Sequence, residues 1–222
     1  DLVANNTMDE HMAALLWAIA EEKRSFVSAA GPQNAGKSTV LFAMLDHVPV
    51  GTPIHEMNGE VDEMNEYAKS PDGGYLEVGE ISDHRPVRYI WGEPVRVLFT
   101  TLNTGFSLAT TMHADGVDDV FRQICVENEV SDADASTIQF VVHILRFGED
   151  MESYWRRIDS VHEITGVKNG VQIASELFSW DEETDSFIAS NPVSVLSASS
   201  ALLAERAESI RELAAKVRDA AK

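Results

Sequence analysis

Cysteine is nearly absent from this chain of 222 residues, because Cys125 is the only one. A single cysteine excludes an intrachain disulfide and a cysteine-based zinc site, and it fits a reducing compartment. Long apolar runs are absent too: the longest near the N-terminus, residues 12–20, is far shorter than the roughly 20 residues that span a bilayer. Two glutamates follow this run and no basic leader precedes it, so it is also a poor signal peptide.

Positive charge is scarce. The chain has 17 Lys and Arg against 37 Asp and Glu, so the formal charge is 17 − 37 = −20. This balance argues against nucleic acid and anionic membrane surfaces as partners, because phosphate contacts need a basic face. Hydrophobic residues make up 44% of the chain, which is typical of a globular domain with a real core. We interpret the acidic excess as a solvated, salt-adapted surface, concentrated in residues 51–83 and 115–134.

Apolar spacing predicts alternating helices and strands, the pattern of an α/β protein. We expect helices over residues 8–22, 38–47, 117–126 and 198–221, and strands over residues 24–30, 75–81, 107–112, 137–147, 154–164 and 171–180. Asn169-Gly170 between the last two strands predicts a β-hairpin. Residues 49–74 read as loop or short helix, and residues 181–196 as a connection. The final helix has an apolar stripe that must pack on the domain or on a neighbour, formed by Leu203, Ile210, Leu213 and Val217.

A glycine-rich segment after the first predicted strand carries the strongest chemical signal. Its sequence is Gly31-Pro32-Gln33-Asn34-Ala35-Gly36-Lys37-Ser38, followed by Thr39 at the start of a predicted helix. It fits G-x-x-x-x-G-K-[S/T], the P-loop, in which backbone N–H groups and a helix N-terminus face a phosphate. In this pattern Lys37 reaches the β- and γ-phosphates and the Ser38 hydroxyl binds Mg²⁺. We therefore predict an ATP and Mg²⁺ site here.

A P-loop enzyme also needs a carboxylate at the end of a second strand, to bind Mg²⁺ or to orient the attacking water. Glu80 ends the apolar run that begins at Tyr75, so it is the candidate. Ser38 and Glu80 together are the predicted metal ligands. No histidine pair has the spacing of a zinc site, and His47, His55, His84, His143 and His162 receive no role.

Four motifs in order resemble the ATPases of type II and type IV secretion and pilus assembly. The segment 79–83 (GEISD) resembles their Walker B motif, and Asn103-Thr104-Gly105 with residues 109–115 (ATTMHAD) resembles their histidine box. Residues 156–166 (RRIDSVHEITG) and Leu177-Phe178 before Asp181 resemble the strands that follow. The resemblance covers about residues 10–185.

The resemblance implies catalytic roles for Lys37, Glu80 and His113, with His113 sensing the γ-phosphate. It implies a cytoplasmic motor, peripheral at the inner membrane, that works as a hexameric ring on a membrane secretion or pilus platform. It also implies a RecA-like, three-layer α/β P-loop fold with a C-terminal β-hairpin and terminal helix. We expect an ATPase core over residues 1–185, then a connection and a packed amphipathic helix over residues 186–222.

Three departures from the family pattern bear on activity. We expect the family's N-terminal domain to be missing, and only 43 positions separate Lys37 from Glu80, an acidic interval in which residues 55–57 (HEM) are the nearest match to the Asp box. Ser82 replaces the Walker B arginine. Arginines that compensate charge at the γ-phosphate accelerate phosphoryl transfer by orders of magnitude. Hydrolysis is therefore predicted to be slow unless Arg85, Arg88, Arg96 or a neighbouring subunit substitutes.

Two alternatives remain open at this stage. One is a reduced paralogue that binds nucleotide, or binds a true motor subunit, with little or no turnover. The other is an unrelated P-loop enzyme such as a small-molecule kinase, against which the histidine box and the absence of an arginine-rich lid both argue.

Overall fold

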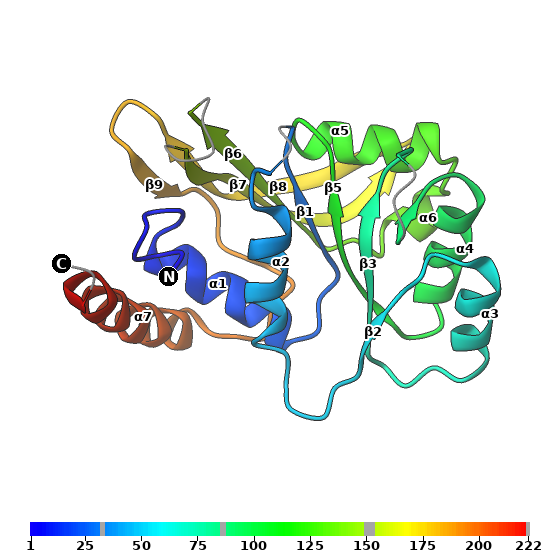
Figure 1. Ribbon diagram of the computed structural model, residues 1–222, viewed down its shortest axis with the longest axis horizontal. Coiled ribbons are helices and arrows are strands. Elements are labelled where there is room, and N and C mark those ends of the chain that lie inside the picture. The colour runs from blue at the N-terminus through cyan, green and yellow to red at the C-terminus, as the bar shows by residue number, and fades with distance from the viewer. Residues whose placement is uncertain (32–33, 85–87, 149–153, 221–222) are drawn as a thin grey trace.

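The chain forms one mixed sheet covered by helices, with the N- and C-terminal helices side by side (Figure 1). The structure is a computed structural model that describes residues 1–31, 34–84, 88–148 and 154–220. Its helices are α1 (Glu10–Glu21), α2 (Lys37–Leu45), α3 (Val61–Lys69), α4 (Glu93–Leu102), α5 (Val117–Phe121), the π-helical η1 (Arg122–Glu127), α6 (Asp132–Ala135) and α7 (Ser200–Ala220).

The sheet has a parallel half and an antiparallel half. Its strands are β1 (Phe26–Ala29), β2 (Ile54–Glu56), β3 (Tyr75–Ile81), β4 (Tyr89–Ile90), β5 (Ser107–Met112), β6 (Phe140–Phe147), β7 (Trp155–Lys168), β8 (Val171–Asp181) and β9 (Ser186–Ala189). The spatial order is β2-β3-β5-β1-β6-β7-β8-β9, and β4 pairs with the end of β3. The strands from β2 to β6 run parallel, and those from β6 to β9 run antiparallel.

Apolar side chains leave both faces of the sheet and pack under two groups of helices. Along β1, Phe26 joins the core beneath α1, α2 and α7, whereas Val27 joins the core beneath α3, α4 and α5. This alternation is the period of two that a strand imposes on its side chains. Helices therefore cover both faces of the sheet, as the α/β prediction requires.

Local sequence signals explain where several elements begin and turn. The Asp9 carboxylate accepts a hydrogen bond of 2.7 Å from the Met12 N–H and so caps α1. Asn169 and Gly170 both have positive φ, 54° and 74°, as a two-residue hairpin turn between β7 and β8 demands. The predicted hairpin is thereby confirmed.

Three predictions of local structure were incomplete. Residues 49–74, expected to be loop or short helix, contain the strand β2 as well as α3, and the expected connection 181–196 contains β9. The helix α4 was not predicted. The strands β2 and β9 lie at the two edges of the sheet, where few apolar residues are needed. Their side chains Ile54 and Ile188 are exposed. On α7 the predicted stripe is only partly right, because Leu213 is 62% exposed while Ala207 and Ala214 are buried.

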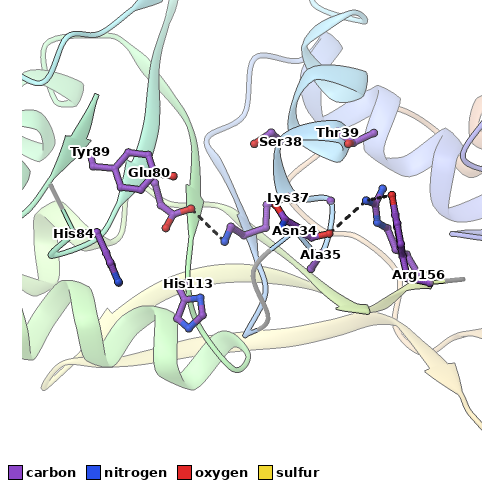
Figure 2. Close-up of a pocket in the computed structure, with 12 residues that line it drawn as sticks. Asn34, Ala35, Lys37, Ser38, Thr39, Glu80, His84, Tyr89, His113 and Arg156 are labelled. Atoms are coloured by element: carbon purple, nitrogen blue, oxygen red, sulfur yellow. Dashed lines mark hydrogen bonds and ion pairs between the residues drawn. The ribbon is translucent and has the colours of Figure 1, made fainter. Parts of the chain in front are cut away.

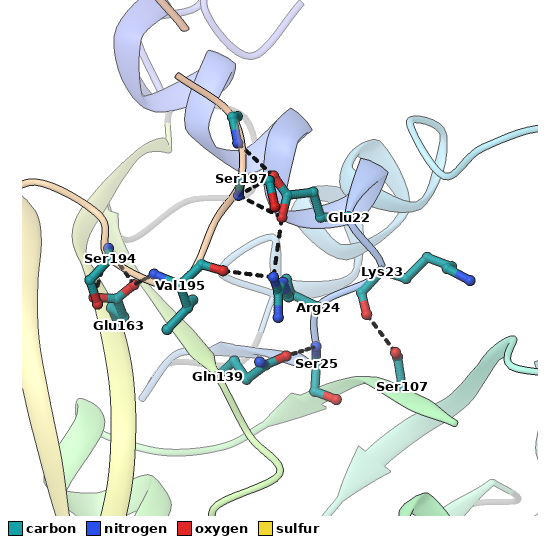
Figure 3. A network of polar contacts seen from close by, with 11 residues as sticks. Glu22, Lys23, Arg24, Ser25, Ser107, Gln139, Glu163, Ser194, Val195 and Ser197 are labelled. Atoms are coloured by element: carbon teal, nitrogen blue, oxygen red, sulfur yellow. Dashed lines mark hydrogen bonds and ion pairs between the residues drawn. The ribbon is translucent and has the colours of Figure 1, made fainter. Parts of the chain in front are cut away.

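A polar clamp fixes the connection between β9 and α7 (Figure 3). The carboxylate of Glu163, which is 1% exposed, accepts hydrogen bonds from the N–H groups of Ser194 and Val195, both at 2.8 Å. Glu22 accepts from the Ser197 N–H at 2.7 Å, and Arg24 donates to the Val195 carbonyl at 2.6 Å. The clamp directs α7 back onto α1 of the same chain.

Among the described residues, no helix is both long and apolar enough to cross a membrane.

Candidate functional site

Three parallel strands bring the predicted site residues to one edge of the sheet. Lys37 begins α2 after β1, Glu80 lies at the end of β3, and His113 directly follows β5. The order β3-β5-β1 makes these strands neighbours, and the carboxyl ends of parallel strands meet at one edge, where α/β proteins bind their ligands. All three side chains line one cavity of about 500 Å³ (Figure 2).

The other residues that line this cavity come from the glycine-rich loop, from the segment after β3 and from the start of β7. They are Asn34, Ala35, Gly36, Ser38, Thr39, His84, Tyr89, Tyr154 and Arg156. The structure thus brings together the described loop residues that the sequence predicted, from Asn34 to Thr39. Pro32 and Gln33 lie outside the described residues, and Gly31 is part of the loop but not of the lining.

The described part of the loop turns into α2 at Gly36. Gly36 has φ 100° at the N-cap of α2, a left-handed conformation that favours glycine. A Cβ on Gly36 would also lie 3.0 Å from the Arg156 side chain. Behind the loop, the Ser28 hydroxyl donates to the Lys37 carbonyl at 3.0 Å and ties the start of α2 to β1. The N-terminus of α2 is therefore held facing the cavity.

Lys37 and Glu80 form the charged centre of the cavity. The Lys37 Nζ lies 3.1 Å from a Glu80 carboxylate oxygen, and the two side chains are 10% and 11% exposed. Figure 2 shows the lysine reaching across from α2 to β3. The Thr111 hydroxyl lies 2.8 Å from the Gly79 carbonyl and 3.2 Å from the Glu80 carboxylate. Tyr89 lies opposite Glu80 in the pairing of β4 with β3, and burial and the neighbouring Glu80 charge raise the pKa of this phenol.

Two histidines lie on the same side of the cavity. His113 is exposed, and its carbonyl accepts a hydrogen bond of 2.8 Å from the Gln123 side chain, which fixes the turn after β5. His84 was given no role from the sequence, yet it lines the cavity, and its Nδ1 lies 2.7 Å from the Ser82 hydroxyl. Ser82, which stands where the resembling family has an arginine, therefore positions an imidazole at this edge.

The arginines considered as substitutes are engaged elsewhere. Arg88 pairs with the buried Glu77, donates to the Met57 carbonyl at 3.2 Å and lies 3.4 Å from Glu56. Burial raises the pKa of Glu77 although Arg88 opposes the shift, and the ion pair with Arg88 compensates this acid inside an apolar strand.

Arg96 serves another part of the fold. It donates to the Asn128 carbonyl at 3.1 Å and lies 3.7 Å from Glu129. Arg85 lies outside the described residues. Neither Arg88 nor Arg96 lines the cavity, so the suggestion that one of them replaces the missing arginines is not supported.

Arg156 is the arginine that the structure brings to the cavity, although no role was predicted for it. It donates to the Asn34 carbonyl at 3.3 Å and to the Tyr154 hydroxyl at 3.0 Å, and its guanidinium lies 4.6 Å from the centre of the Tyr154 ring. Figure 2 places it across the loop from Glu80. The Arg156-Arg157 pair of the third motif was the available signal, but its position beside the loop depends on the β6–β7 pairing.

Residues 55–57, the proposed match to an Asp box, do not reach the cavity. His55 and Glu56 lie on β2 at the edge of the sheet, where His55 pairs with Asp72 at 2.7 Å, and Met57 directly after β2 is fully buried in the core.

The oxygen ligands in this cavity suit a magnesium ion whose other ligands come from a nucleotide and from water. Ser38 offers a hydroxyl and Glu80 a carboxylate, the hard oxygen ligands that Mg²⁺ prefers. Within the described ranges no three His, Cys, Asp or Glu side chains form a metal cage. Mg²⁺ commonly takes one or two protein ligands plus water and phosphate oxygens, so these residues fit it.

Comparison with known proteins supports the fold and leaves the family open. No family model matches the chain. The uncharacterized protein MJ1287 of Methanocaldococcus jannaschii is 26% identical over 222 residues, covering 84% of this chain and 76% of that protein.

Among solved structures, the VirB11 ATPase of the Brucella suis type IV secretion system, in complex with sulphate, aligns with a TM-score of 0.52 at 12% identity, over 68% of this chain. The DotB ATPase of Yersinia pseudotuberculosis aligns with a TM-score of 0.47 at 10% identity, over 91% of this chain. The chain spans about half of either solved chain, 52% and 53%. At this identity the VirB11 likeness shows the fold alone: a mixed α/β fold of P-loop type, related to that of a secretion ATPase.

Proposed function

We propose that this chain binds Mg²⁺ and ATP in the cavity and hydrolyses ATP to ADP and phosphate, slowly, as the motor domain of a secretion or pilus-assembly apparatus. One observation carries the proposal: Lys37, Glu80 and His113, from three separate sequence motifs, line a single cavity at the carboxyl edge of parallel strands.

The Lys37–Glu80 ion pair suggests how binding begins. A phosphate offers Lys37 more negative charge than one carboxylate does, so Lys37 moves its charge-assisted hydrogen bonds to the β- and γ-phosphates. Glu80 is then free to accept a hydrogen bond from water. Ser38 and Glu80 are the residues that would hold Mg²⁺, which would neutralise negative charge on the phosphates.

Glu80 then orients the water whose oxygen bonds to the γ-phosphorus while the bond from phosphorus to the ADP oxygen breaks. The water proton leaves through Glu80, and ADP and inorganic phosphate are the products. His113, which lines the same cavity as Glu80, reports the presence of the γ-phosphate. Lys37 is the described cation nearest Glu80, and Arg156 lies across the loop from it, so slow turnover is expected.

Binding of the non-hydrolysable analogue AMP-PNP with Mg²⁺, measured by calorimetry, tests the first step. We expect Lys37→Ala to weaken binding by roughly 10- to 100-fold, because hydrogen bonds to charged groups contribute about 1.5–3 kcal/mol each. Lys69→Ala, an exposed lysine on α3, is the matched control and should bind as the wild type does. Equal affinities for wild type and Lys37→Ala would refute the proposal.

A second candidate is a reduced paralogue that binds nucleotide without turnover. The engagement of Arg88 and Arg96 away from the cavity favours it. Normal AMP-PNP binding with no phosphate release from ATP would establish this reading.

The quaternary and cellular roles follow from the resemblance. We propose a cytoplasmic homo-oligomer, a hexameric ring, that contacts a membrane platform protein, with residues 1–185 as the ATPase core and residues 186–222 as the connection and packed helix. The clamp on residues 194–198 and the packing of α7 on α1 support the packed helix of this proposal.

A further inference from the structure

The described residues on the Glu80 side of the nucleotide cavity include two histidines and no arginine. Lys37 reaches the terminal phosphates in a P-loop and pairs here with Glu80, so the γ-phosphate would lie beside these two side chains. His84 and His113 line the cavity on this side, whereas Arg156 lies across the loop (Figure 2). The described side chains that could balance further γ-phosphate charge here are therefore imidazoles.

The segment that carries His84 is fixed to the end of β3. Ser82 is 4% exposed, and its N–H donates to the Ile90 carbonyl at 3.0 Å, which extends the pairing of β3 with β4. The Ser82 hydroxyl lies 2.7 Å from Nδ1 of His84 and accepts a hydrogen bond of 3.3 Å from the His84 backbone N–H. Two contacts with one buried residue thus set the position of this imidazole.

The same contacts determine what Nε2 of His84 can donate. The Ser82 hydroxyl already accepts the backbone N–H, so it is placed to donate to Nδ1 of the neutral ring, and the ring proton then resides on Nε2. In the charged ring both nitrogens carry a proton. Nε2 is therefore an N–H donor in either state, and protonation adds a positive charge. A charge-assisted hydrogen bond is roughly twice as strong as a neutral one.

His84 is the better held of the two imidazoles. At His113 the contact with Gln123 is made by the backbone carbonyl, so it does not set the direction of the ring. At His84 the contact with Ser82 is made by the ring itself, and an Asp83 carboxylate oxygen lies 3.4 Å from Nδ1.

The titratable and charged groups around His84 come from several elements. They are Asp83 on its own segment, Glu80 on β3, Tyr89 on β4, Lys37 on α2 and His113 after β5, with Tyr154 and Arg156 on the far side of the cavity. The charges of Lys37 and Glu80 offset each other at 3.1 Å. A triphosphate brings further negative charge to this cavity, and negative charge near an imidazole favours its protonated form.

We propose that protonated His84 contacts the γ-phosphate and supplies part of the charge that arginines commonly supply to phosphoryl transfer. Turnover should then rise as the pH falls through the titration of this imidazole. Ser82 is the positioning residue that holds the ring. The inference rests on the proposed function, because it concerns the same nucleotide cavity.

The first test follows the His84 imidazole by NMR and does not depend on turnover. The probes are AMP-PNP with Mg²⁺ and ADP with Mg²⁺, which differ in the γ-phosphate. We expect AMP-PNP to raise the pH at the midpoint of the His84 titration by more than ADP does. His11, an exposed histidine on α1, is the matched control and should titrate alike in the free, ADP-bound and AMP-PNP-bound protein. A His84 midpoint that both nucleotides move equally overturns the proposal.

The second test compares turnover of wild type with that of His84→Gln, a side chain that keeps a neutral N–H donor and does not titrate. The ratio of the two rates at saturating ATP cancels the titration of ATP itself. Because an imidazole titrates at about pH 6.5, we expect a ratio near one at pH 8.5 and of about fivefold or more at pH 6. A ratio that does not change with pH overturns the proposal. A low-pH gain that survives in His84→Gln and vanishes in His113→Gln assigns the charge to His113 and also overturns it.

Two further variants distinguish charge from a merely structural effect. His84→Arg should exceed His84→Gln by the same factor at both pH values, because a guanidinium is always charged, and equal rates would count against the proposal. Ser82→Ala should lose part of the low-pH gain, and a full gain in Ser82→Ala overturns the positioning role.

Failure of the proposed function gives a different result. A chain that binds no AMP-PNP by calorimetry at pH 6 or pH 8.5 overturns the proposed function, and this inference with it. AMP-PNP binding with an unmoved His84 midpoint overturns this inference alone. AMP-PNP binding with a raised midpoint but no phosphate release at pH 6 supports the contact and overturns its effect on turnover.

Discussion

At the residue scale, the chemistry of the cavity depends on which partner each charged side chain contacts. Lys37 and Glu80 neutralise each other at 3.1 Å in a largely buried position, so a phosphate that binds Lys37 would have to displace Glu80 from it. Arg88 is committed to Glu77 and Arg96 to the Asn128 carbonyl. Arg156 alone of the arginines in the described chain lines the cavity, on the opposite side of the loop from Glu80.

Arg156→Ala should therefore weaken nucleotide binding more than it slows turnover at saturation. We expect about a tenfold rise in the dissociation constant of AMP-PNP, because one charge-assisted contact is worth roughly 1.5 kcal/mol or more. Arg211→Ala, an exposed arginine on α7, is the matched control. A large fall in turnover at saturating ATP, with affinity unchanged, would contradict this placement.

Asp185 anchors the strand that carries Arg156, and its titration should be visible in stability. Hydrogen bonds from Arg157 and Trp180 hold the pKa of Asp185 down at about 2. A carboxyl whose pKa is lowered by folding stabilises the fold above its unfolded pKa, about 3.9 for Asp, and loses that contribution as pH falls through the folded value. The deficit of Asp185→Asn relative to wild type in urea unfolding should thus shrink between about pH 4 and pH 2. A deficit that stays constant over this window would contradict the assignment.

The sequence could predict residues whose role is encoded in a local motif. Gly36, Lys37 and Ser38 follow from one octapeptide, and Glu80 from the end of one apolar run. It could not predict residues such as Arg156 and Tyr89, because their presence in the cavity depends on strand pairing between distant segments.

At the scale of elements, the central strands were predictable and the edges were not. The strands β3 and β5 were predicted with their observed bounds, since buried parallel strands read as continuous apolar runs. The edge strands β2 and β9 have exposed side chains and little pattern. The helix α4 buries Val95, Leu98, Phe99 and Leu102 at helical spacing and has Pro94 in its first turn, where proline is common, but this helix was not predicted.

The clamp at Glu163 should control how α7 is attached. Glu163→Gln removes the charge that three N–H and O–H donors of Ser194 and Val195 share, so we expect a loss of about 1.5–3 kcal/mol in the free energy of unfolding. Hydrogen exchange of residues 194–198 should accelerate. Glu182→Gln, an exposed acid, serves as control. Unchanged exchange in Glu163→Gln would show that packing of α7 on α1 suffices.

At the scale of the whole molecule, the charge of −20 sets both partner choice and salt response. Self-repulsion weakens as the Debye length falls from about 30 Å at 0.01 M to about 8 Å at 0.15 M. We expect the melting temperature to rise over this range of KCl concentration. A fall would mean that ion pairs outweigh repulsion, and the salt-adapted reading of the surface would be wrong.

The excess of acid between the phosphate loop and Glu80 now has a structural location. Residues 51–83 form β2, α3 and β3, and their acids are mostly exposed, apart from Glu77 and Glu80. The segment therefore adds negative charge to the protein surface and supplies no arginine to the cavity. This accounts for the expectation of slow hydrolysis without excluding nucleotide binding.

Phosphate release from ATP in the presence of Mg²⁺, compared between wild type and Glu80→Gln, is the measurement that tests the central claim most directly. The account predicts slow but measurable turnover in wild type, reduced by roughly 100-fold or more in Glu80→Gln, with AMP-PNP binding retained. Equal turnover in the two proteins would contradict the assignment of Glu80 and with it the hydrolytic site described here.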